Sequence, residues 1–236
     1  MRLLVHVEGQ TEETFVKEVL RDHLLGFGYT SVQARLIGNA RLRAKRGGIR
    51  SWSSVKGDIV RHLKEDTGAL STLMVDYYAM PATGDRGWPG RAVDVGLSTS
   101  SKAQILEDAL KVDVASAYGP DFDATRFLPF VLMYEFEGLL FSDCEAFARG
   151  IGCAHKVNSF FAIRNAFQTP EDINDSPQTA PSKRIEGVIS SYEKPLHGIL
   201  GLMEIGLEVI KRECPNFRGW LERLEALAGG PQNIQT

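Results

Sequence analysis

The chain has 236 residues, of which 43% are hydrophobic and 24% are charged, and these globular proportions exclude wholesale disorder. Its net charge of -3 is unlike that of a protein that coats nucleic acid non-specifically, so such binding would need a local basic patch. Three cysteines without a C-x-x-C pair argue against a disulfide framework and a structural zinc site, and no apolar run reaches the roughly 20 residues of a membrane span. We therefore expect a reduced, cytoplasmic protein.

Short apolar runs alternate with amphipathic stretches over the first 142 residues. The patterns predict strands at 3–7, 32–36, 70–75 and 127–134, and helices at 11–24, 55–63 and 102–114. Strands that alternate with helices are typical of a mostly parallel sheet with helices on both faces. Residues 1–142 are therefore expected to form an α/β domain.

The pattern becomes helical from residue 143 onward. Helices are expected near 144–148, 160–167, 183–191, 196–212 and 217–227. A polar loop with three prolines, residues 168–181, is a candidate hinge or functional loop. Residues 143–236 are therefore predicted to form a helical region that packs on the α/β domain.

Acidic residues follow three of the predicted strands. Glu8 follows the first strand, Asp76 the third, and Glu135 with Glu137 the fourth. Because ligands of parallel α/β sheets bind at the carboxyl ends of strands, we expect these side chains on one rim. Carboxylates suit Mg²⁺ or Mn²⁺, and such a metal can activate water and stabilise the charge of a phosphodiester under attack. The alternative is that each acid only ends a strand or caps the next helix.

Two acids at this rim carry specific alternatives. If the fourth strand persists, Glu137 faces the same side as Glu135, which is the spacing of a two-carboxylate metal site. If Glu137 begins a helix instead, its role is to stabilise the helix end. Glu12 is either a further ligand at the same rim or an acid that stabilises the start of the first helix.

Several short motifs in a fixed order resemble a known family. Residues 7–12, V-E-G-Q-T-E, look like the opening motif of Toprim domains, and residues 76–78, D-Y-Y, fall where those domains carry paired aspartates. Nearly the whole chain resembles the Toprim-like domain-of-unknown-function 4276 family. The further matching blocks are E-F-E-G-L-L-F at 135–141, I-N at 173–174, T-A-P-S-K-R-I at 179–185 and L-H-G at 196–198.

This resemblance implies a Toprim-like fold with a helical C-terminal addition, and divalent-metal chemistry on phosphodiesters. Related Toprim nucleases are those of the overcoming-lysogenisation-defect type, and family members often occur beside ABC-type ATPases in bacterial defence loci. One position departs from the Toprim pattern, because Tyr78 stands in place of the second aspartate and tyrosine is a poor magnesium ligand. Either Glu135 or Glu137 supplies the missing oxygen, or the site is weak or inactive.

A local excess of basic residues lies between residues 35 and 61, where Asp58 is the only acid. Interleaved glycines and Trp52 suit contact with a phosphate backbone and an unstacked base. The alternatives to nucleic-acid binding are that this stretch is a solvated loop or that it binds an ATPase partner. The nucleic-acid contacts expected here are Arg41, Arg43, Lys45, Arg46 and Arg50.

Lys183 and Arg184 begin a predicted helix. They either hold a phosphate together with backbone amides, or Lys183 pairs with Glu186.

The sequence thus favours a metal-dependent Toprim-like nuclease acting on DNA or RNA. Its expected catalytic residues are Glu8, Asp76 and Glu135, and Glu12 and Glu137 are expected to join them as ligands of Mg²⁺ or Mn²⁺. The alternative is a non-catalytic Toprim-like scaffold or regulatory subunit that binds an ATPase, and self-association stays open.

Overall fold

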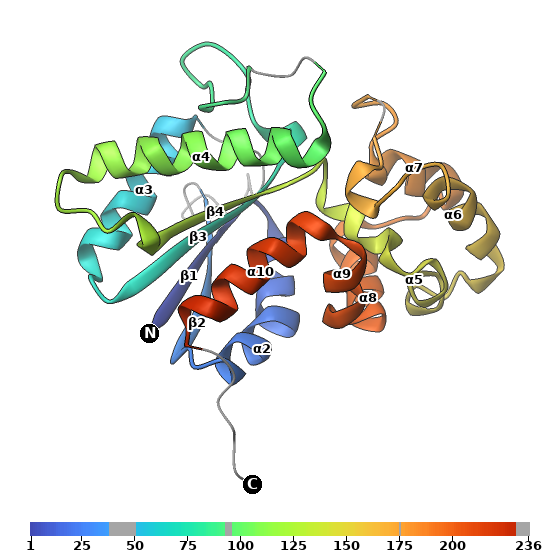
Figure 1. Ribbon diagram of the computed structural model, residues 1–236. Helices are drawn as coiled ribbons and strands as arrows, with labels where there is room; N and C mark the ends of the chain where they lie inside the picture. The colour runs from blue at the N-terminus through green and yellow to red at the C-terminus, as the bar shows by residue number, and fades with distance from the viewer. Residues whose placement is uncertain (38–50, 93–95, 175, 230–236) are drawn as a thin grey trace, which may run out of the picture.

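Four parallel strands form one sheet through the middle of the molecule (Figure 1). The computed structural model describes residues 1–37, 51–92, 96–174 and 176–229. The sheet has the order β2-β1-β3-β4, and its strands are β1 (Arg2–Val7), β2 (Ser31–Leu36), β3 (Ala69–Asp76) and β4 (Phe127–Leu132). All four predicted strands are present and every pairing is parallel, so the expected α/β fold is confirmed.

The strand order reverses between β1 and β3. The chain passes from β1 outward to β2 and then crosses back to form β3 and β4 on the other side of β1. In open parallel sheets, ligands bind beyond the carboxyl ends of the strands at such a reversal. Val7 of β1 pairs with Met74, and β3 continues to Asp76, so the two strands end at the same edge.

Two helices, α3 (Trp52–Glu65) and α4 (Thr99–Tyr118), cover one face of the sheet (Figure 1). Apolar side chains recur along each helix at the spacing of one helical face, which is the face that is buried. They form an apolar cluster with alternate residues of β3 and β4. Its members include Val55, Ile59, Leu63, Leu73, Val75, Leu106, Leu110, Val114 and Val131.

The first and last helices of the chain cover the opposite face. After β1 the chain runs through α1 (Gln10–Phe15), the π-helical turn η1 (Val16–Leu20) and α2 (Arg21–Gly26), and α10 (Pro215–Leu227) returns to lie near them (Figure 1). The Trp220 ring of α10 stacks on Phe130 with centroids 4.7 Å apart, and its Nε1 donates a 2.9 Å hydrogen bond to Thr72 Oγ1. The C-terminal helix therefore completes a layer over the N-terminal sheet.

The remaining helices gather beyond the end of β4 (Figure 1). They are α5 (Cys144–Gly150), α6 (Val157–Arg164), α7 (Pro181–Val188), α8 (Lys194–Ile205) and α9 (Leu207–Glu213). Short 3₁₀ turns are η3 (Tyr77–Ala79), η4 (Ala124–Arg126), η5 (Phe136–Ser142), η6 (Ala154–Lys156) and η7 (Pro170–Asp172). Among the described helices, none has the length and apolar character needed to span a membrane.

Two predicted elements differ in the structure. The predicted helix at 196–212 is divided into α8 and α9, because Gly206 between them has a φ of +82°, a conformation that glycine adopts readily. The fourth strand ends at Leu132 instead of Tyr134. Leu132 pairs with Asp76, the last residue of β3, so the chain beyond Leu132 has no neighbouring strand to pair with.

Candidate functional site

Two acids sit at the reversal of the sheet. Glu8 directly follows β1, and Asp76 is the last residue of β3. Asp76 Oδ1 accepts a hydrogen bond from Phe136 N at 2.9 Å, and the Glu8 and Asp76 carboxyl groups interact electrostatically. The Asp76 carboxylate therefore joins the end of β3 to the start of η5, and Glu8 follows the neighbouring strand β1 at the same edge.

A lysine from the C-terminal helices completes this group. Lys194, the first residue of α8, places its Nζ 2.9 Å from Glu137 Oε2 and 3.9 Å from Asp76 Oδ2. Glu137 lies in η5 and its side chain has no exposed surface. We name these four residues, Glu8, Asp76, Glu137 and Lys194, the acid rim.

Some oxygens of the acid rim are buried and unsatisfied. Within the described part of the chain, Glu8 Oε2 and Glu137 Oε1 have no hydrogen-bond partner. Native proteins rarely leave buried polar atoms in this state, since each unsatisfied group costs about 1–3 kcal/mol. A ligand that binds oxygen would satisfy both atoms.

The proton affinities of the rim acids show how crowded they are. Burial, reinforced by the charge of Glu12, raises the pKa of Glu8 to about 7. Burial likewise raises the pKa of Glu137 to about 7 and holds that of Asp76 well above its usual value. Burial alone would lower the pKa of Lys194, but the Glu137 and Asp76 carboxylates outweigh it and raise that pKa. The rim thus gathers three buried carboxyl groups around a single ammonium.

Glu12 has the structural role that its position at a helix start allows. Its Oε2 accepts a 3.0 Å hydrogen bond from Gly9 N, which fixes the turn between β1 and α1. A side chain at Gly9 would meet this oxygen, because an added Cβ would lie 3.0 Å from Glu12 Oε2. The buried Glu12 charge still raises the pKa of both Glu8 and Asp76, so it borders the rim electrostatically.

Glu135 and Glu137 meet different partners. Because the strand has already ended, the alternation that would place both on one side does not extend to them. Glu135 Oε2 accepts a 2.9 Å hydrogen bond from Ser182 N in the first turn of α7, whereas Glu137 pairs with Lys194. Glu137 does begin a 3₁₀ helix, but its contacts are those of a buried ion pair.

Tyr78 is engaged at the edge of the rim. Its hydroxyl donates a hydrogen bond to Asn174 Oδ1, and its ring packs against Tyr134 with centroids 5.5 Å apart. Tyr78 therefore links η3 to the polar loop at 168–181.

The predicted phosphate contacts are only partly described. Lys183 forms a 2.8 Å ion pair with Glu186, which is the surface pairing that the sequence left open. Arg184 Nε donates to Thr179 O at 2.7 Å, and its guanidinium lies 5.0 Å from the centre of the Phe167 ring. The other five candidates, Arg41, Arg43, Lys45, Arg46 and Arg50, lie outside the described residues.

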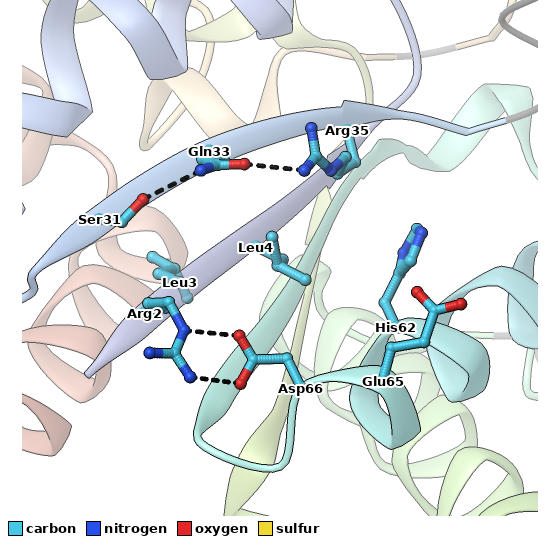
Figure 2. A pocket seen from close by; sticks show the side chains of 9 residues that line it. All are labelled: Arg2, Leu3, Leu4, Ser31, Gln33, Arg35, His62, Glu65 and Asp66. Atoms are coloured by element: carbon cyan, nitrogen blue, oxygen red, sulfur yellow. Dashed lines mark hydrogen bonds and ion pairs between the residues drawn. The ribbon is translucent and has the colours of Figure 1, made fainter.

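A separate pocket of about 480 Å³ lies among β1, β2 and α3 (Figure 2). Figure 2 shows Arg2 directed at Asp66 and Arg35 at Gln33, joined by hydrogen bonds of 2.5–2.6 Å and 2.8 Å. The polar groups of this pocket are thus largely paired with one another. None of the predicted site residues lines it.

The donor chemistry of the acid rim fits a hard divalent cation, because it offers carboxylate oxygens and two of them are buried without partners. In the described ranges, no three Asp, Glu, His or Cys side chains converge closely enough to hold a metal ion as they are placed. The positive charge found at this position is the Lys194 ammonium.

Lys194 is not among the site residues predicted from the sequence. A usable signal was present, because a lysine followed by Pro195 begins α8. A cation is unfavourable at the positive end of a helix unless an anion lies nearby. A Lys-Pro pair at a predicted helix start therefore indicates an acidic partner, although it does not say which one.

Residues 7–225 match a family described as a domain of unknown function, DUF4276, and the chain belongs to that family. No curated protein and no solved structure matches the chain. The matched range includes all four residues of the acid rim.

Proposed function

We propose that this DUF4276 protein is a divalent-metal-dependent phosphodiester hydrolase that acts on DNA or RNA in the cytoplasm. The observation that carries the proposal is the meeting of Glu8, Asp76 and Glu137 at the reversal of the sheet, with buried oxygens that lack partners. The resemblance to Toprim nucleases supports the same chemistry and adds an ABC-type ATPase partner in bacterial anti-phage defence.

In this proposal Glu8, Asp76 and Glu137 hold Mg²⁺ or Mn²⁺. A bound metal would lower the pKa of a coordinated water and stabilise the charge that develops on the phosphodiester. The protein supplies orientation, since Phe136 N fixes Asp76 and the end of β1 fixes Glu8.

The second candidate is a non-catalytic scaffold or regulatory subunit that binds an ATPase. Two observations favour it: Lys194 already pairs with Asp76 and Glu137, and Tyr78 is bonded to Asn174 and offers no carboxylate. This candidate needs neither a bound metal nor cleavage.

Calorimetric titration with Mn²⁺, run beside a cleavage assay, separates the two candidates. The substrates are labelled single-stranded DNA, duplex DNA and RNA, with Mg²⁺, with Mn²⁺ and with EDTA. A hydrolase should bind Mn²⁺ and cleave only with metal, and Glu8→Gln and Asp76→Asn should each weaken binding at least tenfold because a neutral amide is a poor ligand.

The matched control is Glu171→Gln, which alters a buried acid with a raised pKa whose two oxygens accept hydrogen bonds from α10, and it should leave Mn²⁺ affinity unchanged. Cleavage that survives in EDTA and in both rim variants would exclude the proposed mechanism. Absence of Mn²⁺ binding by the wild type and by the rim variants would favour the scaffold.

A further inference from the structure

Lys194 occupies the position at which a cation must sit to neutralise the acid rim. Its Nζ lies 2.9 Å from Glu137 Oε2 and 3.9 Å from Asp76 Oδ2, on the two acids that come from η5 and β3. Glu135 and Glu137 also interact electrostatically with this ammonium, so several carboxylates share a single positive charge.

We propose that Lys194 is the resident counter-ion of the acid rim and that a divalent metal binds there by displacing it. This inference rests on the proposed metal site and adds its regulation, because Lys194 and the metal compete for Asp76 and Glu137. A metal bound to the same oxygens would lie beside the ammonium, and two cations at that separation in a partly buried site repel each other strongly.

The pairing of Lys194 is incomplete in a way that permits exchange. Its side chain is 43% exposed, and one oxygen of Glu137 and one of Glu8 are left without a partner. The buried pair between Lys211 and Glu225 gives the contrast. There the lysine is only 19% exposed, contacts both carboxylate oxygens at 2.8 Å, and shares the acid with His23. Lys211 is therefore held by two short contacts in a buried position, whereas Lys194 is more exposed and can be displaced from the acids.

The test uses the full chain and three variants: Lys194→Met, Lys194→Gln and Lys183→Met. Lys183 is the matched control because it is a nearby exposed lysine that interacts electrostatically with Glu135 and Lys194 but pairs with Glu186. Mn²⁺ affinity is measured by calorimetry, and Tm is measured in EDTA and with saturating Mn²⁺. Lys194→Gln keeps a polar side chain and serves if Lys194→Met does not fold.

Competition predicts that removing the Lys194 charge makes Mn²⁺ bind at least tenfold tighter, while Lys183→Met changes affinity less than twofold. In EDTA the Lys194 variants should melt below the wild type, because the acids lose their counter-ion, and saturating Mn²⁺ should raise their Tm more than that of the wild type.

Equal or weaker Mn²⁺ binding in both Lys194 variants, with measurable binding by the wild type, would overturn the competition and leave the proposed metal site standing. An equal gain in Lys183→Met would also overturn it, since the effect would then be general charge. If neither the wild type nor any variant binds Mn²⁺, the competition and the proposed function both fail. Binding that appears only in the Lys194 variants would support competition.

Discussion

Two groups of buried carboxylates in this protein share one property and differ in another. Burial raises the pKa of Glu107 and Glu171 to about 7, just as it raises the pKa of Glu8 and Glu137 to about 7. The first two acids, however, have donors on both of their oxygens, whereas the rim acids do not.

The partners of Glu107 and Glu171 explain why these acids are structural. Glu107 accepts a hydrogen bond from Val131 N on the outer strand β4, and its other oxygen bonds to Arg223. Glu171 accepts from the backbone amides of Asn216 and Phe217, so it caps the start of α10. Each carboxylate satisfies backbone or side-chain donors that would otherwise be buried without an acceptor.

The difference shows that a raised pKa does not identify a functional acid in this chain, because burial alone produces it. Unsatisfied oxygens together with mutual repulsion distinguish the rim. The His6 and His62 pair limits this criterion, because its rings stack 5.3 Å apart and leave His6 Nε2 and His62 Nδ1 without partners within the described residues. These nitrogen atoms lack partners on uncharged rings. The rim differs because its unpartnered atoms belong to carboxyl groups, which can bind a cation.

The largest effect expected from the comparison is the loss of the Glu171 cap. Glu171→Ala should lower the free energy of unfolding by about 3–5 kcal/mol, because two charge-assisted hydrogen bonds to α10 disappear and two amides lose their acceptor. Urea unfolding measures this change. The control is Glu222→Ala on the exposed side of α10, which should stay within about 0.5 kcal/mol of the wild type. A loss below about 1 kcal/mol for Glu171→Ala would show that a satisfied buried acid is dispensable here.

The next effect is a loss of stability in acid that depends on His6. Burial, with repulsion from His62 and Arg35, lowers the pKa of His6 to about 3. The unfolded chain takes up this proton near pH 6.5 and the folded chain does not, so stability falls as pH drops from about 6.5 toward 3, by about 3 kcal/mol at pH 4.

His6→Leu should remove that part of the slope in urea titrations at pH 7, 5.5 and 4. His155→Leu, at an exposed position, should leave the slope of the wild type intact. If His6→Leu and the wild type lose stability in parallel on acidification, the buried ring is not the group that takes up the proton.

A smaller effect of opposite sign is expected at the rim. At pH 8 without metal, Glu8→Gln should stabilise the fold by about 1–2 kcal/mol, because it removes a buried charge whose oxygen has no partner. The folded-state pKa of Glu8 lies above its unfolded value, so the favourable contribution of this acid is present below about pH 4.5 and is lost as pH rises through about 7.

The gain from Glu8→Gln should therefore shrink at pH 5, where wild-type Glu8 is largely protonated in the fold. Glu13→Gln is the control and should not stabilise the protein, because Glu13 lies in the helix that follows Glu8 but is partly exposed and paired with Lys17. Destabilisation by Glu8→Gln at pH 8 would place Glu8 with the structural acids.

Residues at strand ends were the part of the site that the sequence could predict. Glu8 and Asp76 follow from short apolar runs that end in an acid, because parallel strands bring their carboxyl ends together. Lys194 could not be assigned to the rim, since its contact depends on how α8 packs against a strand end that is distant in sequence. The direction of the Glu135 side chain depends on whether β4 continues past its last pairing with β3. The length of the neighbouring strand decides this, and the local sequence pattern does not show it.

The smallest and last prediction concerns Glu135, which stands between the two groups of acids. One of its oxygens accepts from Ser182 N at the start of α7, as a structural acid would, yet its charge also raises the pKa of Lys194. Glu135→Gln keeps an oxygen acceptor for that amide, so we expect a loss of about 1 kcal/mol or less in the free energy of unfolding. Mn²⁺ affinity should change less than threefold if capping α7 is its main role. The comparison variant is Glu137→Gln, which removes a buried rim charge and should weaken Mn²⁺ binding at least tenfold. If the two variants weaken Mn²⁺ binding equally, Glu135 is a ligand as the sequence predicted. The acid rim would then extend to the start of α7, and Ser182 N would have to share its acceptor with the metal.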